Sequence, residues 1–126
     1  MLKSTNAIAT IAVKDLRAAA VFYEGALGFE KVSIDDEALI IYRSGDSVFN
    51  VYRSKYAGTN EATAISWAVG AGIERIVEEL KTRGVVFEHY DTIPGMTRIG
   101  DIHAGGGTKV AWFKDPDGNI LNIVGS

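Results

Sequence analysis

The feature that most constrains the fold is an internal repeat. An apolar run ending at Val13 is followed by a helical pattern that stops at Gly28, fifteen positions later. A second run ends at Val69, and its helical pattern stops at Gly84, again fifteen positions later. Each glycine stands where a helix C-terminus favours one. Half of a 126-residue chain is too short to bury a stable core easily. The repeat therefore predicts two similar modules whose sheets must pair, within the chain or with a second copy.

Hydrophobic periodicity predicts one strand, one helix and three strands in each module. Asp15 is a good N-cap for a helix from Leu16 to Leu27, whose apolar residues share one stripe, and an equivalent stripe begins at Ile73. The predicted strands are residues 7–13, 29–34, 37–43, 46–53, 62–69 and 85–90, with two more in a C-terminal hairpin. This predicts a single domain, residues 1–126, made of modules at about 7–53 and 62–124 with a polar connector at 54–61.

The C-terminal hairpin is predicted within Lys109–Val124. Apolar runs flank Asp115-Pro116-Asp117-Gly118. Proline suits the second position of a type I turn, and glycine suits the left-handed position that closes it. The pattern thus predicts two antiparallel strands joined by a tight turn.

Composition excludes several classes of function. The net charge of −3 and the pI of about 5.3 argue against a general nucleic-acid-binding protein, which usually has a basic face. The absence of cysteine excludes disulfides, thiolate metal ligands and cysteine nucleophiles. No apolar run approaches the roughly 20 residues of a membrane helix, and the N-terminus lacks a signal-peptide layout. A cytoplasmic location and no membrane partner are expected.

Two motifs carry a family resemblance. Residues 22–29 (Phe-Tyr-Glu-Gly-Ala-Leu-Gly-Phe) and 115–119 (Asp-Pro-Asp-Gly-Asn) resemble the helix-to-strand signature and the final hairpin of the glyoxalase, bleomycin-resistance and extradiol-dioxygenase superfamily, also called vicinal oxygen chelate. The resemblance implies an α+β fold in which two βαβββ modules form a cupped, mostly antiparallel eight-stranded sheet around a cavity. It also implies a homodimer, with the modules paired within the chain or exchanged between chains.

The resemblance further implies four metal-ligand positions, two in each module. They fall on Ile8, Asn50, Ala64 and Asn122, where the family pattern has histidine, glutamine or carboxylate. Divalent metals bind imidazole, thiolate or carboxylate, and aliphatic side chains offer no donor atom. We therefore predict that the family's metal site is absent and that no cofactor is bound.

Strand alternation predicts which side chains line the cavity. Trp112 and Tyr52 could stack on a planar or cationic ligand, and Asn50 and Asn122 could exchange hydrogen bonds with it. Trp112 could equally be a core aromatic, and the two amides could pair with each other or with water. The predicted ligand-binding residues are Asn50, Tyr52, Ser66, Trp112, Asn122, Arg98 and His103.

The glycine-rich segment 91–107 is predicted as a long loop, and such loops are functional or mobile. Its apolar residues suggest either a lid over the cup or a dimer contact: Ile93, Met96, Ile99 and Ile102. Arg98, Asp101 and His103 are the loop residues expected to give a ligand polar contacts. His89 and His103 are both expected to be exposed to solvent.

These observations favour a metal-independent small-molecule-binding protein that resembles the bleomycin-resistance type. The ligand would lie in an apolar and aromatic cup. The alternative is a glyoxalase-like lyase or isomerase, or a dioxygenase, with a metal or catalytic group that is not evident in the sequence. The sequence identifies no catalytic residue, so whether the protein is an enzyme stays open.

Overall fold

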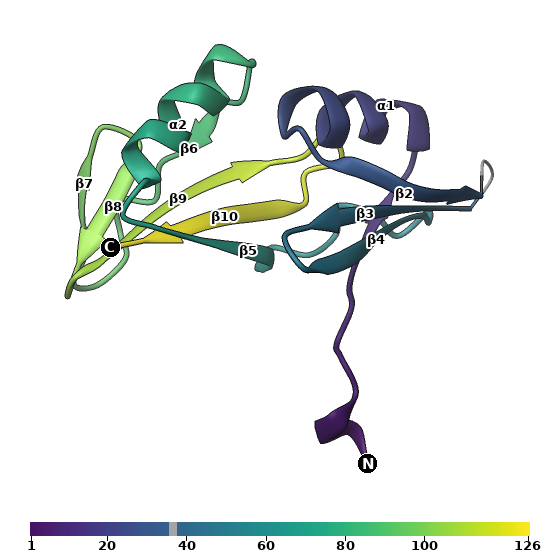
Figure 1. The fold of residues 1–126 in the computed structure, drawn as a ribbon. Helices are drawn as coiled ribbons and strands as arrows, with labels where there is room; N and C mark the ends of the chain where they lie inside the picture. The colour runs from purple at the N-terminus through teal and green to yellow at the C-terminus, as the bar shows by residue number, and fades with distance from the viewer. Residues whose placement is uncertain (36–37) are drawn as a thin grey trace.

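The computed structural model describes residues 1–35 and 38–126. The first part of the chain forms η1 (Leu2–Ser4), β1 (Ala9–Val13), α1 (Leu16–Ala20), η2 (Val21–Ala26), β2 (Glu30–Asp35), β3 (Leu39–Ser44) and β4 (Ser47–Arg53). The second part forms β5 (Thr63–Gly70), α2 (Ile73–Thr82), β6 (Phe87–Glu88), β7 (Thr97–Ile99), β8 (Ile102–Gly105), β9 (Thr108–Lys114) and β10 (Ile120–Gly125). Both helices lie on the same side of the strands (Figure 1).

The strands form two sheets. The first sheet has the order β1-β4-β3-β2, and the second has the order β5-β10-β9-β8-β7, with β6 also paired to β9. In each, the first strand lies parallel to the last, β1 beside β4 and β5 beside β10. The α+β fold class and the repeat are therefore confirmed. Within the described residues, ten strands lie in two sheets of four and six, where eight strands in one sheet were predicted.

The prediction of a long loop at 91–107 is wrong in part. This segment contains the hairpin β7–β8, and β8 pairs with β9 in the second sheet. Gly100, with a φ of +63°, makes the turn between the two strands possible. Strands of three and four residues are too short to show the alternation by which a strand is recognised.

The two helices begin and end much as their patterns predict. Asp15 caps α1 by accepting a hydrogen bond from the Arg17 N–H at 2.9 Å. The predicted helix continues past Ala20 as a π-helical turn, η2, in place of an unbroken α-helix. Gly28 and Gly84 have φ values of +78° and +90°, so each helical segment ends at a left-handed glycine. Among the described residues, no helix is long and apolar enough to cross a membrane.

Aromatic side chains join the two sheets. Phe49 on β4 is 3% exposed, and its ring lies 5.0–6.0 Å from the rings of four others: Tyr23, Phe29, Tyr42 and Trp67. Trp67 belongs to the second sheet, and its indole N–H donates to Ser44 Oγ of the first sheet at 3.0 Å. The hydrophobic core therefore runs from one sheet to the other.

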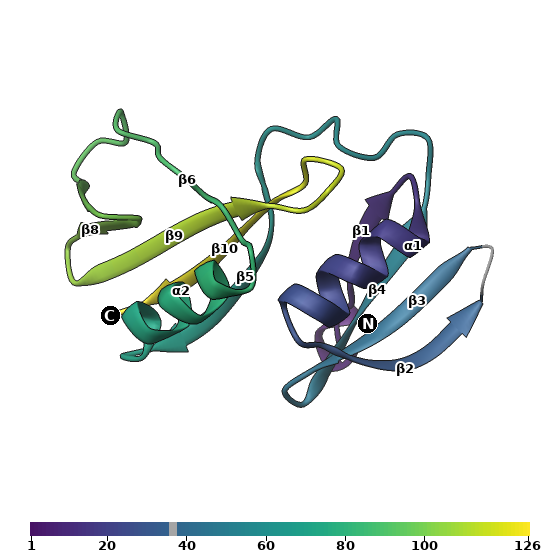
Figure 2. The ribbon, with the colours of Figure 1, turned by 90° about the horizontal axis from the view of Figure 1, so that it is seen from above.

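The turn at residues 115–119 also joins the sheets. Tyr23 Oη donates to Asp115 Oδ2 at 2.9 Å, and Asn119 Nδ2 donates to the Ala12 carbonyl at 2.7 Å. The backbone N–H of Lys14 donates to Asp117 Oδ2 at 3.2 Å. In Figure 2 this turn, between β9 and β10, extends from the second sheet toward β1 and α1. We call residues 115–119 the Asp115 turn.

The connector packs closely on the Asp115 turn at Gly58. A Cβ added at Gly58 would overlap the Asp117 carbonyl oxygen, whereas one added at Gly45 would meet no atom within 4 Å. Both glycines have left-handed φ values, +74° and +57°. We expect Gly58→Ala to lower the free energy of unfolding by about 2–4 kcal/mol and Gly45→Ala by about 1 kcal/mol, measured by urea denaturation. Equal losses would show that the close approach has no energetic role.

Candidate functional site

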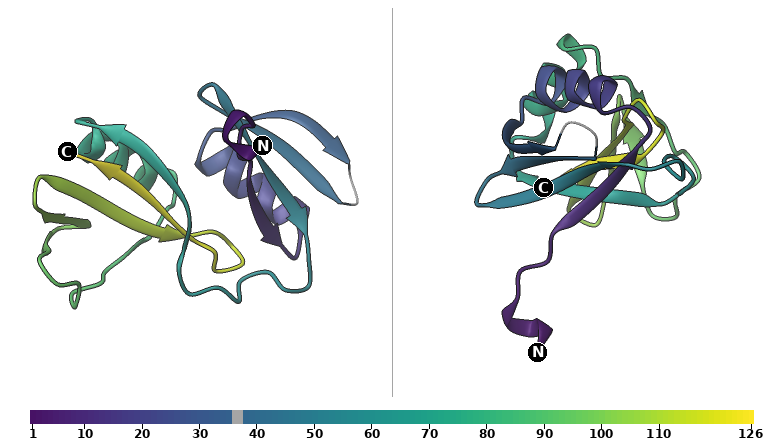
Figure 3. Two further views of the ribbon diagram at one scale, coloured as in Figure 1. Left: turned by 90° about the horizontal axis from the view of Figure 1, so that it is seen from below. Right: turned by 90° about the vertical axis from the view of Figure 1, so that its right-hand side faces the viewer.

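Each sheet has one face against a helix and an opposite face, which we call the open face. Figure 3 shows the open faces of both sheets on the same side of the molecule. In the first sheet, Ile11 and Val51 are buried under the helix, whereas Thr10 is exposed and lies opposite Asn50 in the register. Burial therefore agrees with the faces predicted from strand alternation.

Five of the seven predicted site residues lie on the second sheet. Asn122 of β10 is directly opposite Trp112 of β9 on one side and Ser66 of β5 on the other. His103 pairs with both Arg98 and Val110, which continues this open face onto β8 and β7. The other two predicted residues, Asn50 and Tyr52, lie on β4 in the first sheet. The register places no residue of one sheet opposite a residue of the other.

Asn122 is the most unusual polar residue on the open face. Its side chain is only 7% exposed. Its Oδ1 atom has no hydrogen-bond partner among the described residues. Leaving a buried amide oxygen unpaired costs on the order of 1–3 kcal/mol. The position is therefore unfavourable for stability as it stands.

Trp112 lies across the strand that carries Asn122. Its Nε1–H donates to Thr63 Oγ1 at 3.1 Å. Since Trp112 is on β9 and Thr63 on β5, the indole must pass over β10, which lies between them. The edges of two further rings meet the indole, His103 at 4.9 Å and Tyr90 at 5.3 Å between centroids.

A register shift explains how Thr63 comes to face Trp112. Thr63 pairs with Ile120, but Ile65 pairs with Leu121, so Ala64 is an extra residue in β5. Such a bulge reverses the facing of the residues before it. Thr63, rather than Ala64, therefore shares the face of Asn122. The position that the resemblance assigned to Ala64 is therefore wrong by one residue, because strand alternation assumes an unbroken register.

His103 is buried, with 1% exposure, so the prediction that it is exposed is wrong. Its Nε2 accepts from the Tyr90 backbone N–H at 2.9 Å, and its Nδ1 lies 3.3 Å from the Val110 carbonyl oxygen. These two partners assign the proton to Nδ1. Burial follows from the pairing of β8 with β9, which the sequence did not predict. His89 is exposed as predicted, and its Nε2 lies 2.8 Å from Asp101 Oδ1.

The polar groups of the β7–β8 hairpin are bound to one another. Arg98 donates to Asp91 Oδ1 and to the Gly100 carbonyl oxygen, each at 2.7 Å. Lys81 of α2 lies 2.9 Å from Asp101 Oδ2. Hydrogen bonds from His89 and then Lys81 hold the pKa of Asp101 below its ordinary value. Since the donors of Arg98 already have partners, a ligand must compete for them.

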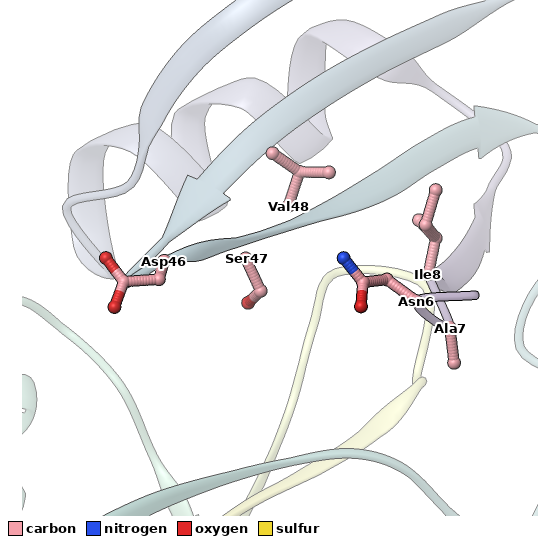
Figure 4. A pocket seen from close by; sticks show the side chains of 6 residues that line it. All are labelled: Asn6, Ala7, Ile8, Asp46, Ser47 and Val48. Atoms are coloured by element: carbon pink, nitrogen blue, oxygen red, sulfur yellow. The ribbon is translucent and has the colours of Figure 1, made fainter. Parts of the chain in front are cut away.

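Two hollows lie away from these residues. An open hollow of about 510 Å³ lies between the N-terminal segment and the start of β4 (Figure 4), lined by Asn6, Ala7, Ile8, Asp46, Ser47 and Val48. An apolar hollow of about 180 Å³ lies between α2, the second sheet and the segment that follows η2, lined by Leu27, Phe29, Trp67, Val69, Ile76, Leu80, Phe113 and Ile123. None of the seven predicted residues lines either hollow.

The sequence profile of the Glyoxalase/Bleomycin resistance protein/Dioxygenase superfamily matches residues 6–123. The chain belongs to this superfamily. No curated protein matches the chain. Among solved structures of similar fold, a glyoxalase family protein from Enterococcus faecalis has a TM-score of 0.73 and 18% identity, covering 98% of this chain and 99% of that one.

Two further solved structures share the superfamily fold. The fosfomycin resistance protein FosX from Listeria monocytogenes has a TM-score of 0.67 and 15% identity, covering 96% of this chain and 90% of that one. A lactoylglutathione lyase from Agrobacterium tumefaciens has a TM-score of 0.67 and 18% identity, covering 97% and 94%. At these identities the likeness establishes the fold.

The four positions on which the resemblance places metal ligands carry residues that do not fit a divalent metal. Ile8 and Ala64 have no donor atom, and Asn50 and Asn122 offer only neutral amides. The bulge at Ala64 brings Thr63 to the open face, which adds a neutral hydroxyl and no carboxylate or imidazole. In the described ranges, 1–35 and 38–126, no group of three histidine or acidic side chains is arranged to hold a metal.

The ionisable groups with the largest pKa shifts lie in the core, away from the open faces. Burial, followed by the nearby Asp115, raises the pKa of Tyr23 far above its ordinary value. Burial and a hydrogen bond to Glu24 raise the pKa of Tyr42 in the same way. Both hydroxyls stay protonated, and each donates to a carboxylate. We assign them structural roles.

Proposed function

We propose that this superfamily member is a metal-independent small-molecule-binding protein of the bleomycin-resistance type. The ligand lies on the open face of the second sheet. The observation that carries the proposal is the composition around Asn122: a neutral amide occupies a metal-ligand position, with the Trp112 indole beside it and the Ser66 hydroxyl on the next strand. Aromatic rings and a few polar groups are the usual lining of a site for an uncharged or cationic organic molecule.

We also propose that the protein is a homodimer in which a second copy packs against the open face of the first sheet. β1 and β5 are edge strands, each paired on one side in the described sheets. On the first sheet, Tyr52 is 38% exposed, and Ile8, just before β1, is 52% exposed. Unpaired edges and bare apolar faces favour association.

Metal content, oligomeric state and ligand binding can be measured on one preparation purified without chelator. Native mass spectrometry and elemental analysis are expected to give twice the chain mass of 13.6 kDa and no stoichiometric Ni, Zn, Fe or Mn. A thermal-shift screen with glycopeptide drugs and aromatic cations then follows in the presence of EDTA. One tightly bound metal ion per chain, together with turnover of a hit, would establish the enzyme alternative instead.

Trp112→Ala should weaken binding of any hit at least about tenfold, because aromatic stacking on a ligand is lost. Tyr56→Ala is the matched control, since Tyr56 is 69% exposed and lies in the connector, outside both open faces. Unchanged affinity in a folded Trp112→Ala variant would remove the second sheet's open face from the site.

A further inference from the structure

Among the buried side-chain nitrogen and oxygen atoms in the described part of the chain, one lacks a partner, and that atom is Oδ1 of Asn122. Other buried polar side chains all have hydrogen bonds. Asp115 accepts from Tyr23, Asn119 bonds to Ala12, and both nitrogens of His103 face partners. Native proteins rarely leave a buried carbonyl unpaired. The exception therefore marks a place where a hydrogen-bond donor is missing.

Trp112, directly opposite Asn122 in the register, is held by one hydrogen bond and by ring contacts with His103 and Tyr90. The Trp112 indole passes over β10, and its only hydrogen bond is from Nε1 to Thr63 Oγ1 at 3.1 Å. This bond lies at the exposed surface of the sheet. On the neighbouring strand β5, the same face carries small side chains, Ser66 and Ala68, both exposed. Breaking one surface hydrogen bond would let the indole turn aside without disturbing the core.

We propose that Asn122 is the anchor of the binding site and accepts a hydrogen bond from an uncharged, planar ligand that carries an N–H group. The ligand class is a primary or secondary amide, a lactam or a heteroaromatic N–H compound. Trp112 is the gate: it leaves Thr63, admits the ligand above Asn122, and stacks on its flat face. This inference rests on the proposed function and specifies the ligand of the same site.

The surroundings select an uncharged donor over a cation. The atom that lacks a partner is a neutral amide oxygen beside an indole, with no carboxylate among its register neighbours Trp112 and Ser66. Glu88, one strand further along this row, lies 3.8 Å from Lys114 and is partly neutralised by it. A buried cation here would lose its hydration without gaining a counter-charge. A neutral N–H group loses little hydration energy on burial and donates the hydrogen bond that the amide oxygen lacks.

The direct test compares ligands in which N-methyl groups replace the N–H groups. Benzamide is paired with N,N-dimethylbenzamide, and 2-pyridone with 1-methyl-2-pyridone. Binding is followed by fluorescence in a Trp67→Phe background, because Trp67 and Trp112 are the two tryptophans of the chain. We expect the N–H member of each pair to bind at least about tenfold more tightly. This difference should vanish in Asn122→Leu, which keeps the side-chain size and removes the oxygen.

The stability of the variants is measured by Tm, and the opening of the Trp112 gate is measured separately by acrylamide quenching. Because it removes an unpaired buried oxygen, Asn122→Leu should raise Tm by about 3–6 °C. Thr63→Val should increase acrylamide quenching of Trp112 about twofold, since the indole loses its only hydrogen bond, whereas Ser66→Ala should leave quenching unchanged.

Three results would overturn the anchor. They are equal binding of the N–H and N-methyl compounds, absence of binding by both, or a lower Tm for Asn122→Leu with a single tightly held water on Oδ1. Equal binding would leave the proposed function intact. A stoichiometric metal would contradict the proposed function itself.

Discussion

Replacing Asp115 by alanine is expected to lower the free energy of unfolding by about 3–5 kcal/mol, as measured by urea denaturation. The carboxylate is 5% exposed. Its Oδ2 accepts from Tyr23 Oη at 2.9 Å and from Asn119 Nδ2 at 2.8 Å. Its Oδ1 accepts from the backbone N–H groups of Asp117 and Asn119, both at 2.9 Å. The alanine variant leaves four buried or half-buried donors without this acceptor, and it loosens the turn that joins the sheets.

Two variants test whether the loss comes from this network. Tyr23→Phe removes one of the four donors and should cost about 1–2 kcal/mol. Asp117→Ala removes one 3.2 Å bond from the Lys14 N–H and should cost less than about 1 kcal/mol. The double variant Asp115→Ala/Tyr23→Phe should cost less than the sum of the single losses, because both changes break the same bond. If Asp115→Ala were no more harmful than Asp117→Ala, the turn would have no role in joining the sheets.

Phe49→Ala should have a similar effect, a loss of about 3–5 kcal/mol. Phe49 is 3% exposed and its ring contacts four other aromatic rings, including Trp67 from the second sheet. Truncation removes apolar burial, leaves a cavity and breaks the ring contacts between the sheets. The Trp67 indole should also become more accessible, so acrylamide should quench its fluorescence more strongly in a Trp112→Phe background.

Phe49→Leu is the matched control. It keeps an apolar side chain in the cavity and should cost about 1–2 kcal/mol, mainly through lost edge-to-face contacts with Phe29 and Trp67. A Phe49→Ala variant as stable as Phe49→Leu would mean that the cavity collapses freely. In that case the aromatic cluster would not set the relation between the two sheets.

Much of the fold could be predicted from the sequence because local patterns carry it. The stripe from Leu16 and the stripe from Ile73 each predict an amphipathic helix, and both helices bury those residues. The equal spacing to Gly28 and Gly84 predicts two copies of one unit, and the two sheets have the same strand order around their first strands. Alternation also predicts which face of each long strand meets the helices.

The short strands could not be predicted from hydrophobic periodicity. β7 and β8 contain three and four residues, so neither shows a period, and their glycines read as loop. The bulge at Ala64 is set by pairing with β10, more than fifty residues away, and it exchanges Thr63 for Ala64 on the open face. His103 is buried by the same kind of distant pairing, with β9.

The Asp-Pro-Asp-Gly-Asn stretch separates what the local sequence determines from what the tertiary structure determines. The sequence by itself determined its turn, because proline and glycine restrict the backbone locally: Gly118 has a φ of +88°, and its N–H bonds to the Asp115 carbonyl oxygen at 3.0 Å. Only the tertiary structure decided that Asp115 accepts a hydrogen bond from Tyr23, ninety-two residues earlier, and that the Trp112 indole reaches Thr63 across the strand that carries Asn122. Hydrogen-bond partners depend on which distant side chains the sheets bring within 3 Å, and no local pattern encodes that distance.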